Sequence, residues 1–107
     1  MCKRIRIYRT QAGRLPFIEW YTSLRDHQGA AKIRVRLRRV RQGNLGDHKS
    51  VGAGVVELRI PFGPGYRVYM GLSGDQIVIL LSGGDKSTQA QDIFQAYSYW
   101  MDYKRHL

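Results

Sequence analysis

The stretch that decides the fold is GAGVVELRIPFGPGYRVYMGLSGDQIVILLSGG, residues 52–84. It holds three runs rich in β-branched, aromatic and aliphatic residues, at Val55–Ile60, Tyr66–Leu72 and Gln76–Ser82. The segments between the runs, residues 61–65 and 73–75, consist mainly of Gly, Pro, Ser and Asp, which is typical of hairpin turns. The stretch therefore predicts three successive strands that pair as an antiparallel meander.

Alternation along these strands sorts their side chains, because successive side chains point to opposite faces of a sheet. Glu57 and Arg59 share a face of the first strand, and Arg67 and Tyr69 share a face of the second. The third run is apolar on both faces, which predicts a central strand. If the two polar pairs lie on the same side, the sheet has one apolar face for a core. Its other face then carries a carboxylate, two guanidinium groups and a phenol, and we expect chemistry there.

The residues outside the meander predict one more strand and three helices. Arg4–Thr10 alternates basic and β-prone residues, which predicts an opening strand parallel to a member of the meander. Pro16 and an apolar stripe predict a helix from Pro16 to about Leu24, with Trp20 in the core rather than exposed for base stacking. Further helices are predicted at about Ala30–Arg41 and Gln89–Arg105, and residues 42–54 are predicted to form a loop.

Together these elements predict an α+β fold, with an antiparallel sheet of about four strands, two N-terminal helices and one C-terminal helix in a single domain, residues 1–107. The opening residues, Met1–Arg6, carry charge but lead into no apolar run of a signal peptide. No apolar run approaches the about 18 residues that span a bilayer. Cys2 is the single cysteine, so no internal disulfide can form. We therefore expect a cytoplasmic protein without a membrane partner.

The composition is strongly basic, with 18 Lys and Arg against 8 Asp and Glu, a net charge of +10. Such a surface attracts polyanions, although a basic surface can also serve solubility alone. The second predicted helix concentrates the charge without a single acid, so its like charges repel one another. We interpret it as a basic ridge for an RNA phosphate backbone or an acidic partner. The ridge consists of Lys32, Arg34, Arg36, Arg38, Arg39 and Arg41.

The candidate chemistry rests on a small polar set. The three histidines lie in separate contexts and the one cysteine has no partner, so no metal site and no cofactor are expected. Residues 82–89 lack the Gly-x-x-x-x-Gly-Lys spacing of a nucleotide phosphate loop. The remaining candidates are Lys49, Glu57, Arg59, Arg67, Tyr69 and Lys86, with His48 at the edge of the set.

Such a set can cleave RNA without a metal ion. The substrate supplies its own nucleophile, a 2′-hydroxyl, so the protein needs to move protons and to stabilise the additional phosphate charge. Arginine forks match phosphate oxygens well. The general base remains open among Glu57, His48 and Lys49. The alternative is structural, because Glu57 could simply form ion pairs with Arg59 or Arg67 across the strands.

Three segments in this order carry a resemblance to a known family. They are KSVGAGVVELRI at residues 49–60, GYRVY at residues 65–69 and LSGGDKSTQ at residues 81–89. The chain resembles, over nearly its whole length, toxins of the RelE/ParE superfamily, most closely the HigB-like "addiction module killer protein" branch. The resemblance implies a RelE-like fold and a type II toxin–antitoxin toxin. RelE-like and HigB-like members are mRNA interferases, ribosome-dependent endoribonucleases that cut mRNA in the decoding site, inhibit translation and arrest growth.

The resemblance also implies residue roles and partners. Arg67 matches the phosphate-contacting arginine of the family, Arg59 a second basic residue of the preceding strand, and Lys86 the basic residue after the last strand. The implied partners are the ribosome, mRNA and a helix-turn-helix antitoxin, whose complex with the toxin is expected to bind operator DNA.

The chain also departs from the family pattern. RelE has two lysines in the strand before its Leu-Arg pair, where this chain has Val55 and Glu57, and the late catalytic tyrosine falls here near Asp92. The resemblance therefore leaves the general acid and base unassigned. ParE-like members inhibit DNA gyrase and cleave no RNA. A gyrase inhibitor and a basic nucleic-acid-binding module are the alternative functions.

Overall fold

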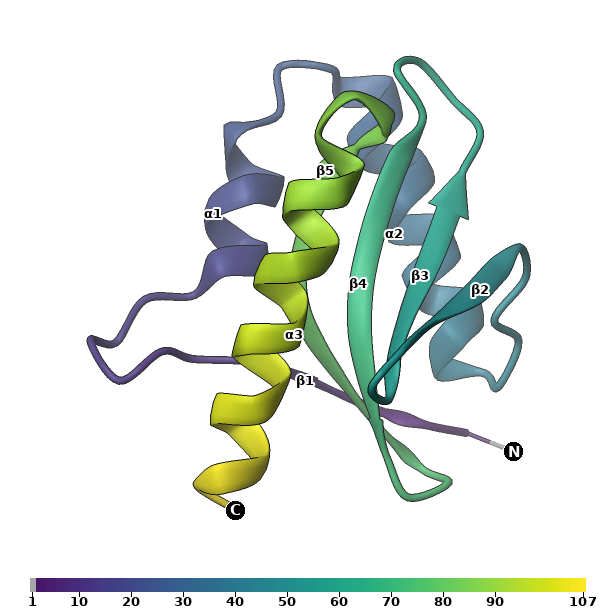
Figure 1. The fold of residues 1–107 in the computed structure, drawn as a ribbon. Helices are drawn as coiled ribbons and strands as arrows, with labels where there is room; N and C mark the ends of the chain where they lie inside the picture. The colour runs from purple at the N-terminus through teal and green to yellow at the C-terminus, as the bar shows by residue number, and fades with distance from the viewer. Residues whose placement is uncertain (1) are drawn as a thin grey trace.

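The computed structural model describes residues 2–107 and contains one sheet with helices on both faces (Figure 1). Its elements are β1 (Arg4–Ile7), α1 (Pro16–Ser23), α2 (His27–Arg41), β2 (His48–Gly52), β3 (Val55–Ile60), β4 (Tyr66–Ser73), β5 (Ile77–Asp85), the 3₁₀-helix η1 (Lys86–Thr88) and α3 (Gln89–Arg105). The α+β class and the three predicted meander strands are confirmed. The three helices also lie where the sequence predicts them, within three residues at each end.

The sheet differs from the prediction in its strand number, whereas the parallel pairing of the opening strand with a meander strand is confirmed. It has five strands in the order β1-β5-β4-β3-β2, so β5 lies in the interior of the sheet between β1 and β4, as its apolar sequence predicts. All pairs are antiparallel except β1 and β5, which run parallel with Ile5 opposite Val78. The sheet is therefore mixed and five-stranded, where an antiparallel sheet of about four strands was expected.

The additional strand, β2, forms from residues that were predicted to be a loop. It lies at the edge of the sheet and four of its five residues are exposed, so it lacks the buried alternation that identifies a strand. The turn to β3 has positive φ angles at Gly52, Ala53 and Gly54 (97°, 57° and 86°). Such angles favour glycine, which explains why the segment reads as a loop.

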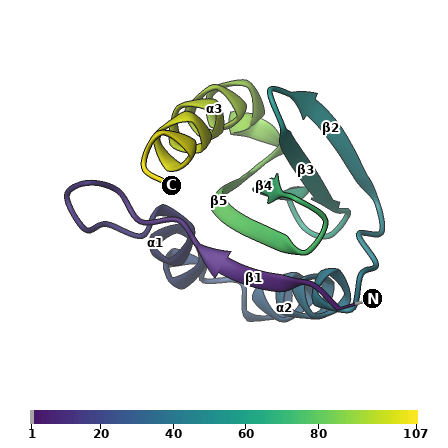
Figure 2. The same cartoon turned by 90° about the horizontal axis from the view of Figure 1, so that it is seen from below.

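Two apolar cores lie on the two faces of the sheet, and Figure 2 shows α3 on one side and α1 and α2 on the other. The first core packs Val56, Leu58, Ile60, Val68, Met70 and Leu80 against Phe17, Ile33 and Val40 from α1 and α2. The second packs Val55, Tyr69, Ile79 and Leu81 against Ala96 and Trp100 from α3. The face expected to carry the polar side chains is therefore divided, because α3 covers one end as a second core and leaves the polar side chains at the other.

Local contacts explain where the helices begin and how they pack. Helix α2 begins at His27, three residues before the predicted start, because the Asp26 carboxylate caps it by accepting a hydrogen bond of 2.9 Å from the Gly29 N–H. Trp20 packs against the first core, as predicted, with its ring centroid 6.2 Å from that of Tyr66.

Helix α3 docks through a close approach of Trp100 to the backbone of β4. A Cβ added at Gly71 would lie 2.2 Å from the Trp100 ring, and Trp100 is only 4% exposed. We therefore expect Gly71→Ala to lower the free energy of unfolding by about 1–3 kcal/mol through overpacking, measured by urea denaturation. The control is Gly74→Ala in the β4–β5 turn, where no atom lies within 4 Å and only the left-handed φ of 65° costs about 1 kcal/mol. Equal losses in the two variants would contradict the proposed docking contact.

Candidate functional site

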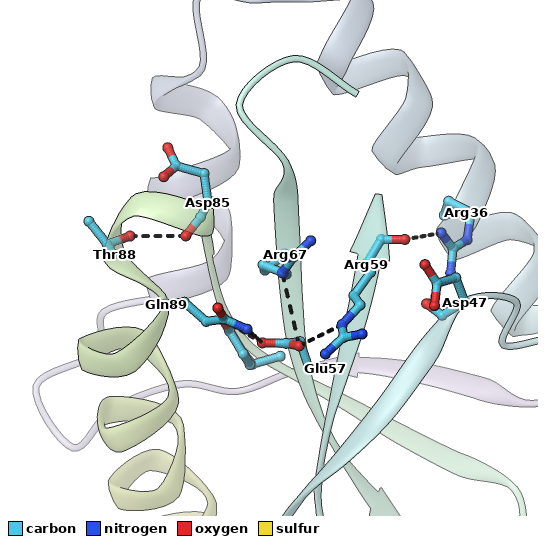
Figure 3. Close-up of polar contacts among 9 residues, drawn as sticks. Arg36, Asp47, Glu57, Arg59, Arg67, Asp85, Thr88 and Gln89 are labelled. Atoms are coloured by element: carbon cyan, nitrogen blue, oxygen red, sulfur yellow. Dashed lines mark hydrogen bonds and ion pairs between the residues drawn. The ribbon is translucent and has the colours of Figure 1, made fainter. Parts of the chain in front are cut away.

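The polar side chains of β3 and β4 meet on one face of the sheet. Glu57 lies directly opposite Tyr69 in the register, and Arg59 lies opposite Arg67. Because directly opposed residues of antiparallel strands point to the same side, the two pairs share one face, as the alternation predicted. This is the face that α3 covers in part, and Glu57 contacts Gln89 at the first turn of α3 (Figure 3).

Glu57 is the centre of the cluster and is completely buried, with 0% exposure. Arg59 Nε donates to its Oε1 at 3.0 Å, while Tyr69 Oη and Gln89 Nε2 donate to its Oε2 at 3.1 and 2.8 Å. Burial by itself raises the pKa of Glu57, but the hydrogen bonds from Gln89, Arg59 and Tyr69 and the charge of Arg67 outweigh it and hold the pKa below its ordinary value. Glu57 is therefore an ionised anchor at neutral pH.

Arg67 is held beside this anchor but is not satisfied by it. Its side chain is 12% exposed, and its Nε lies 3.9 Å from Glu57 Oε1, beyond hydrogen-bond distance. This Nε is buried and has no hydrogen-bond partner among residues 2–107. A buried donor without a partner costs about 1–3 kcal/mol, so it calls for an explanation. An acceptor brought by a ligand would supply one.

Two lysines extend the cluster. Lys86, the exposed first residue of η1, and Arg67 both flank Gly65, since a Cβ added there would lie 3.4 Å from Lys86 Cβ and 3.9 Å from Arg67 Nη1. Lys49 lies opposite Glu57 in the β2–β3 register, so its exposed side chain shares the face of the cluster. The structure thus gathers four cations, from four separate segments, around one carboxylate.

The two other predicted residues have different positions. His48 lies opposite Leu58, which belongs to the first core, so it faces the other side of the sheet, and its Nδ1 lies 2.8 Å from the Gly46 carbonyl oxygen. Tyr69 is on the correct face but fully buried, and burial together with the charge of Glu57 raises the pKa of its hydroxyl. Tyr69 therefore helps to hold Glu57 in place by donating a hydrogen bond to its carboxylate.

The predicted ridge on α2 is less uniform than its sequence indicates. It lies on the opposite side of the sheet from Glu57, and its members have different environments. Arg34 Nη1 donates to Tyr21 Oη at 2.7 Å, and Lys32 Nζ lies 5.2 Å from the centroid of the Phe62 ring. Arg38, Arg39 and Arg41 are exposed.

Arg36 differs most from its expected place on the surface. Its Nη1 donates to the carbonyl oxygen of Arg59 at 2.5 Å, and its Nη2 donates to those of Leu45 and Asp47 at 2.8 and 2.9 Å. Burial lowers the pKa of its guanidinium. Arg36 therefore braces α2 against the start of the β2–β3 hairpin through its two terminal nitrogens, while its Nε is buried without a partner among residues 2–107.

This brace yields a stability prediction. We expect Arg36→Met to lower the free energy of unfolding by about 2–3 kcal/mol, because three carbonyl groups lose a charged donor. The matched control is Arg39→Met on the same helix, where the side chain is exposed and the change should stay within about 0.5 kcal/mol. Urea unfolding of both variants checks this, and the brace is rejected if they unfold alike.

Two residues from α3 complete the site and were not among the predicted site residues. Gln89 Nε2 donates a hydrogen bond to Glu57, which lies 32 positions earlier in the chain. Asp92 accepts a hydrogen bond of 2.5 Å from Thr88 Oγ1, and its Oδ2 would lie 1.9 Å from a Cβ added at Gly84, the strand partner of Arg67. Burial raises the pKa of Asp92. Asp92, whose carboxyl group keeps its proton to higher pH, therefore lies over Gly84 of β5, the strand that pairs with the strand of Arg67.

In residues 2–107, no three His, Cys, Asp or Glu side chains come together as a group that could hold a metal ion. No helix in the described part of the chain is both long and apolar enough to cross a membrane.

The fold and the site define a small, basic α+β protein in which a buried carboxylate on a mixed sheet anchors two arginines beside two lysines. A Haemophilus influenzae protein (strain ATCC 51907 / DSM 11121 / KW20 / Rd), which carries the name "Uncharacterized protein", is 51% identical over 82 residues, covering 77% of this chain and 83% of the relative. The chain belongs to the same family as this relative. No protein-family profile matches the chain.

Proposed function

We propose that this protein is the toxin of a type II toxin–antitoxin system and that the cluster around Glu57 cleaves RNA. The observation that carries the proposal is the placement of Arg59, Arg67 and Lys49 on one face of the sheet around the buried carboxylate of Glu57. A phosphate group offers the acceptor oxygens that an arginine fork fits. The resemblance of residues 49–60, 65–69 and 81–89 to RelE/ParE toxins, and so to a RelE-like fold, supports the same assignment.

The charge of the cluster suits a phosphodiester and its transition state. Glu57 balances one of the two arginines, which leaves one positive charge for a ligand, and Lys49 and Lys86 add two more at the rim. A phosphodiester carries one negative charge, and a second develops when the phosphorus becomes pentacoordinate. Arginines fixed by Glu57 before the substrate arrives stabilise this additional charge without reorganising, which is the largest catalytic term in many enzymes.

The reaction is an internal transfer at phosphorus. The 2′-oxygen attacks the adjacent phosphorus while the bond to the 5′-oxygen breaks, which leaves a 2′,3′-cyclic phosphate and a 5′-hydroxyl. One proton leaves the 2′-hydroxyl and one joins the 5′-oxygen. Lys49, and Asp92 with its raised pKa, are the groups on this face that can move these protons. Glu57 acts as a positioning residue, because both of its oxygens are occupied.

The partners follow from the same assignment. The substrate is mRNA on the ribosome in the cytoplasm, and cleavage inhibits translation and arrests growth. A helix-turn-helix antitoxin neutralises the toxin, and the complex binds operator DNA. Burying this many cations requires acidic or hydrogen-bonding groups on the antitoxin.

The test maps cleavage in a translating extract. Purified protein is added to an extract that translates a defined message, and the new RNA 5′ ends are located by primer extension. We expect ends within the coding region for the wild type and for the surface control Arg9→Ala, and none for Arg67→Ala. Intact message in all three reactions overturns the proposal. The same message without ribosomes tests whether cleavage depends on the ribosome.

A second candidate is a ParE-like inhibitor of DNA gyrase. It is favoured by exposed apolar side chains on α3, where Phe94 is 77% and Met101 54% exposed, because such residues commonly mark a protein contact. A supercoiling assay separates the two functions. Gyrase inhibition that persists in Arg67→Ala and is lost in Phe94→Ser/Met101→Ser would favour this candidate over the nuclease.

A further inference from the structure

A second cationic site lies between β1 and α2, on the side of the sheet away from Glu57. Figure 2 shows these two elements next to each other. They enclose a groove of about 820 Å³ whose eight lining residues include five cations and no acid. The five are Lys3, Arg4, Arg34, Arg38 and Arg41.

The groove is fixed by backbone hydrogen bonds. The Lys3 N–H donates to the Arg41 carbonyl oxygen at 2.7 Å, which ties the start of β1 to the end of α2, and the Arg4 N–H donates to the Gln76 carbonyl oxygen at 2.6 Å. Ile5 and Leu37, both partly buried against the first core, form its apolar part. The concave shape is therefore part of the fold.

The positive charge of the groove is not neutralised within the described chain. The ion pairs among residues 2–107 join Arg14 to Glu19, Arg59 and Arg67 to Glu57, and His106 to Asp102, so none involves a groove cation. Lys3 Nζ donates to the backbone carbonyl oxygen of Asp75, and Arg34 Nη1 donates to the hydroxyl oxygen of Tyr21. Both acceptors are neutral, so they orient the two side chains without removing their charge. Like charges held together around a concavity favour a polyanionic ligand.

The helix dipole does not explain the cluster. Positive side chains in the last turn of a helix are favourable, which accounts for Arg38 and Arg41 on α2. It does not account for Lys3 and Arg4, which belong to a different element, or for Arg34, two turns before the end of the helix. The convergence of two elements on one groove requires another reason.

The arrangement of the cations fits a nucleic acid strand. Arg34, Arg38 and Arg41 have i, i+4, i+7 spacing, so they form one row of about 10 Å along α2, and Lys3 lies across the groove from this row. A double-helical strand presents about three phosphates over that length. Four of the five cations are arginines, whose forks suit phosphate oxygens. The concave shape does not match a flat lipid surface.

We propose that this groove binds the phosphate backbone of double-stranded RNA, as a docking site separate from the Glu57 cluster. The choice of RNA over DNA rests on the proposed function, whereas the phosphate chemistry rests on the groove alone. With the two sites on opposite faces of the sheet, a structured RNA bound in the groove leaves the Arg59–Arg67 face open to a single strand.

The test compares two charge-matched double variants. Arg38→Glu/Arg41→Glu alters the groove, and Arg9→Glu/Arg25→Glu makes the same charge change at exposed positions outside it. The probe is a fluorescein-labelled 20-base-pair 2′-O-methyl RNA duplex, which resists cleavage, followed by fluorescence anisotropy at several salt concentrations. We expect the groove variant to bind at least about tenfold more weakly and to lose about two units of salt slope, one for each phosphate contact. The control should lose about threefold or less.

Several outcomes overturn the proposal. Equal losses in the two variants mean that net charge alone attracts RNA. Tighter binding of an acidic peptide or of phosphatidylserine vesicles, or of a DNA duplex of the same sequence, assigns the groove to another ligand. Circular dichroism verifies folding, and Arg38→Gln/Arg41→Gln is the milder variant if the glutamates unfold the chain. Because the probe is not cleaved, the result does not depend on whether Arg67 cuts RNA, so the groove and the nuclease can fail separately.

Discussion

Arg67→Ala is expected to lower the rate of RNA cleavage by about 10²–10³-fold, the usual effect of removing one preorganised group that stabilises the transition-state charge. The side chain is 12% exposed and lies beside Glu57 on the face that carries Arg59 and Lys49. Glu57 keeps its hydrogen bonds from Arg59, Tyr69 and Gln89 in the variant. We therefore expect a folded variant that keeps the anchor and loses activity, measured as the single-turnover cleavage rate of a defined message in a translating extract.

Arg67→Lys tests whether the fork or only the charge is required. A lysine keeps the positive charge but gives up the planar pair of donors that matches two phosphate oxygens. We expect it to recover only part of the lost rate, at least about tenfold below the wild type. Arg59→Ala should lower the cleavage rate less than Arg67→Ala does. The Arg59 side chain is more exposed, at 34%, and its Nε already donates a hydrogen bond to Glu57. Wild-type cleavage by a folded Arg67→Ala would remove this site from the mechanism.

The sequence predicts the strands well where one face must be buried. Val56, Leu58 and Ile60 alternate with polar residues in β3, and the buried face fixes which side each residue takes. This alternation correctly predicts that Glu57 and Arg59 share the opposite face. Strand β2 could not be predicted in this way, since an exposed edge strand buries almost nothing and its sequence is under no such constraint.

The roles within the site depend on contacts that alternation does not describe. Whether Glu57 is a base or an anchor depends on its burial under α3 and on the hydrogen bond from Gln89, which the chain places 32 positions away. Arg36 and Arg39 look alike in the sequence, and only the carbonyl groups around Arg36 distinguish them. The Gly83-Gly84 pair is the one local signal, because Trp20 and Asp92 occupy the space that two Cβ atoms would need.

The second large effect concerns Glu57. We expect Glu57→Ala to lower the free energy of unfolding by about 3–5 kcal/mol, because removing one partner of a buried ion pair leaves the other charge uncompensated. The control is Glu19→Ala, whose ion pair with Arg14 is 2.6 Å long but lies on the surface, with side chains 45% and 70% exposed, so its loss should cost at most about 1 kcal/mol. Urea unfolding at pH 7 measures both. A loss at Glu57 no larger than that at Glu19 would show that the cluster is not held together by this carboxylate.

The pH dependence of stability distinguishes the charge of Glu57 from its packing. Its pKa in the folded protein lies below that of the unfolded chain, about 4.3 for glutamate, so its ionised form stabilises the fold above that pH. This contribution is lost as the pH falls through the folded pKa, since protonation removes the charge that Arg59 and Arg67 face. We expect the difference in stability between the wild type and the nearly isosteric Glu57→Gln to be greatest at neutral pH and to shrink steadily below about pH 4.5. If burial rather than ionic attachment held the cluster, the two proteins would lose stability in parallel on acidification, and Arg67 would need another anchor to meet a phosphate.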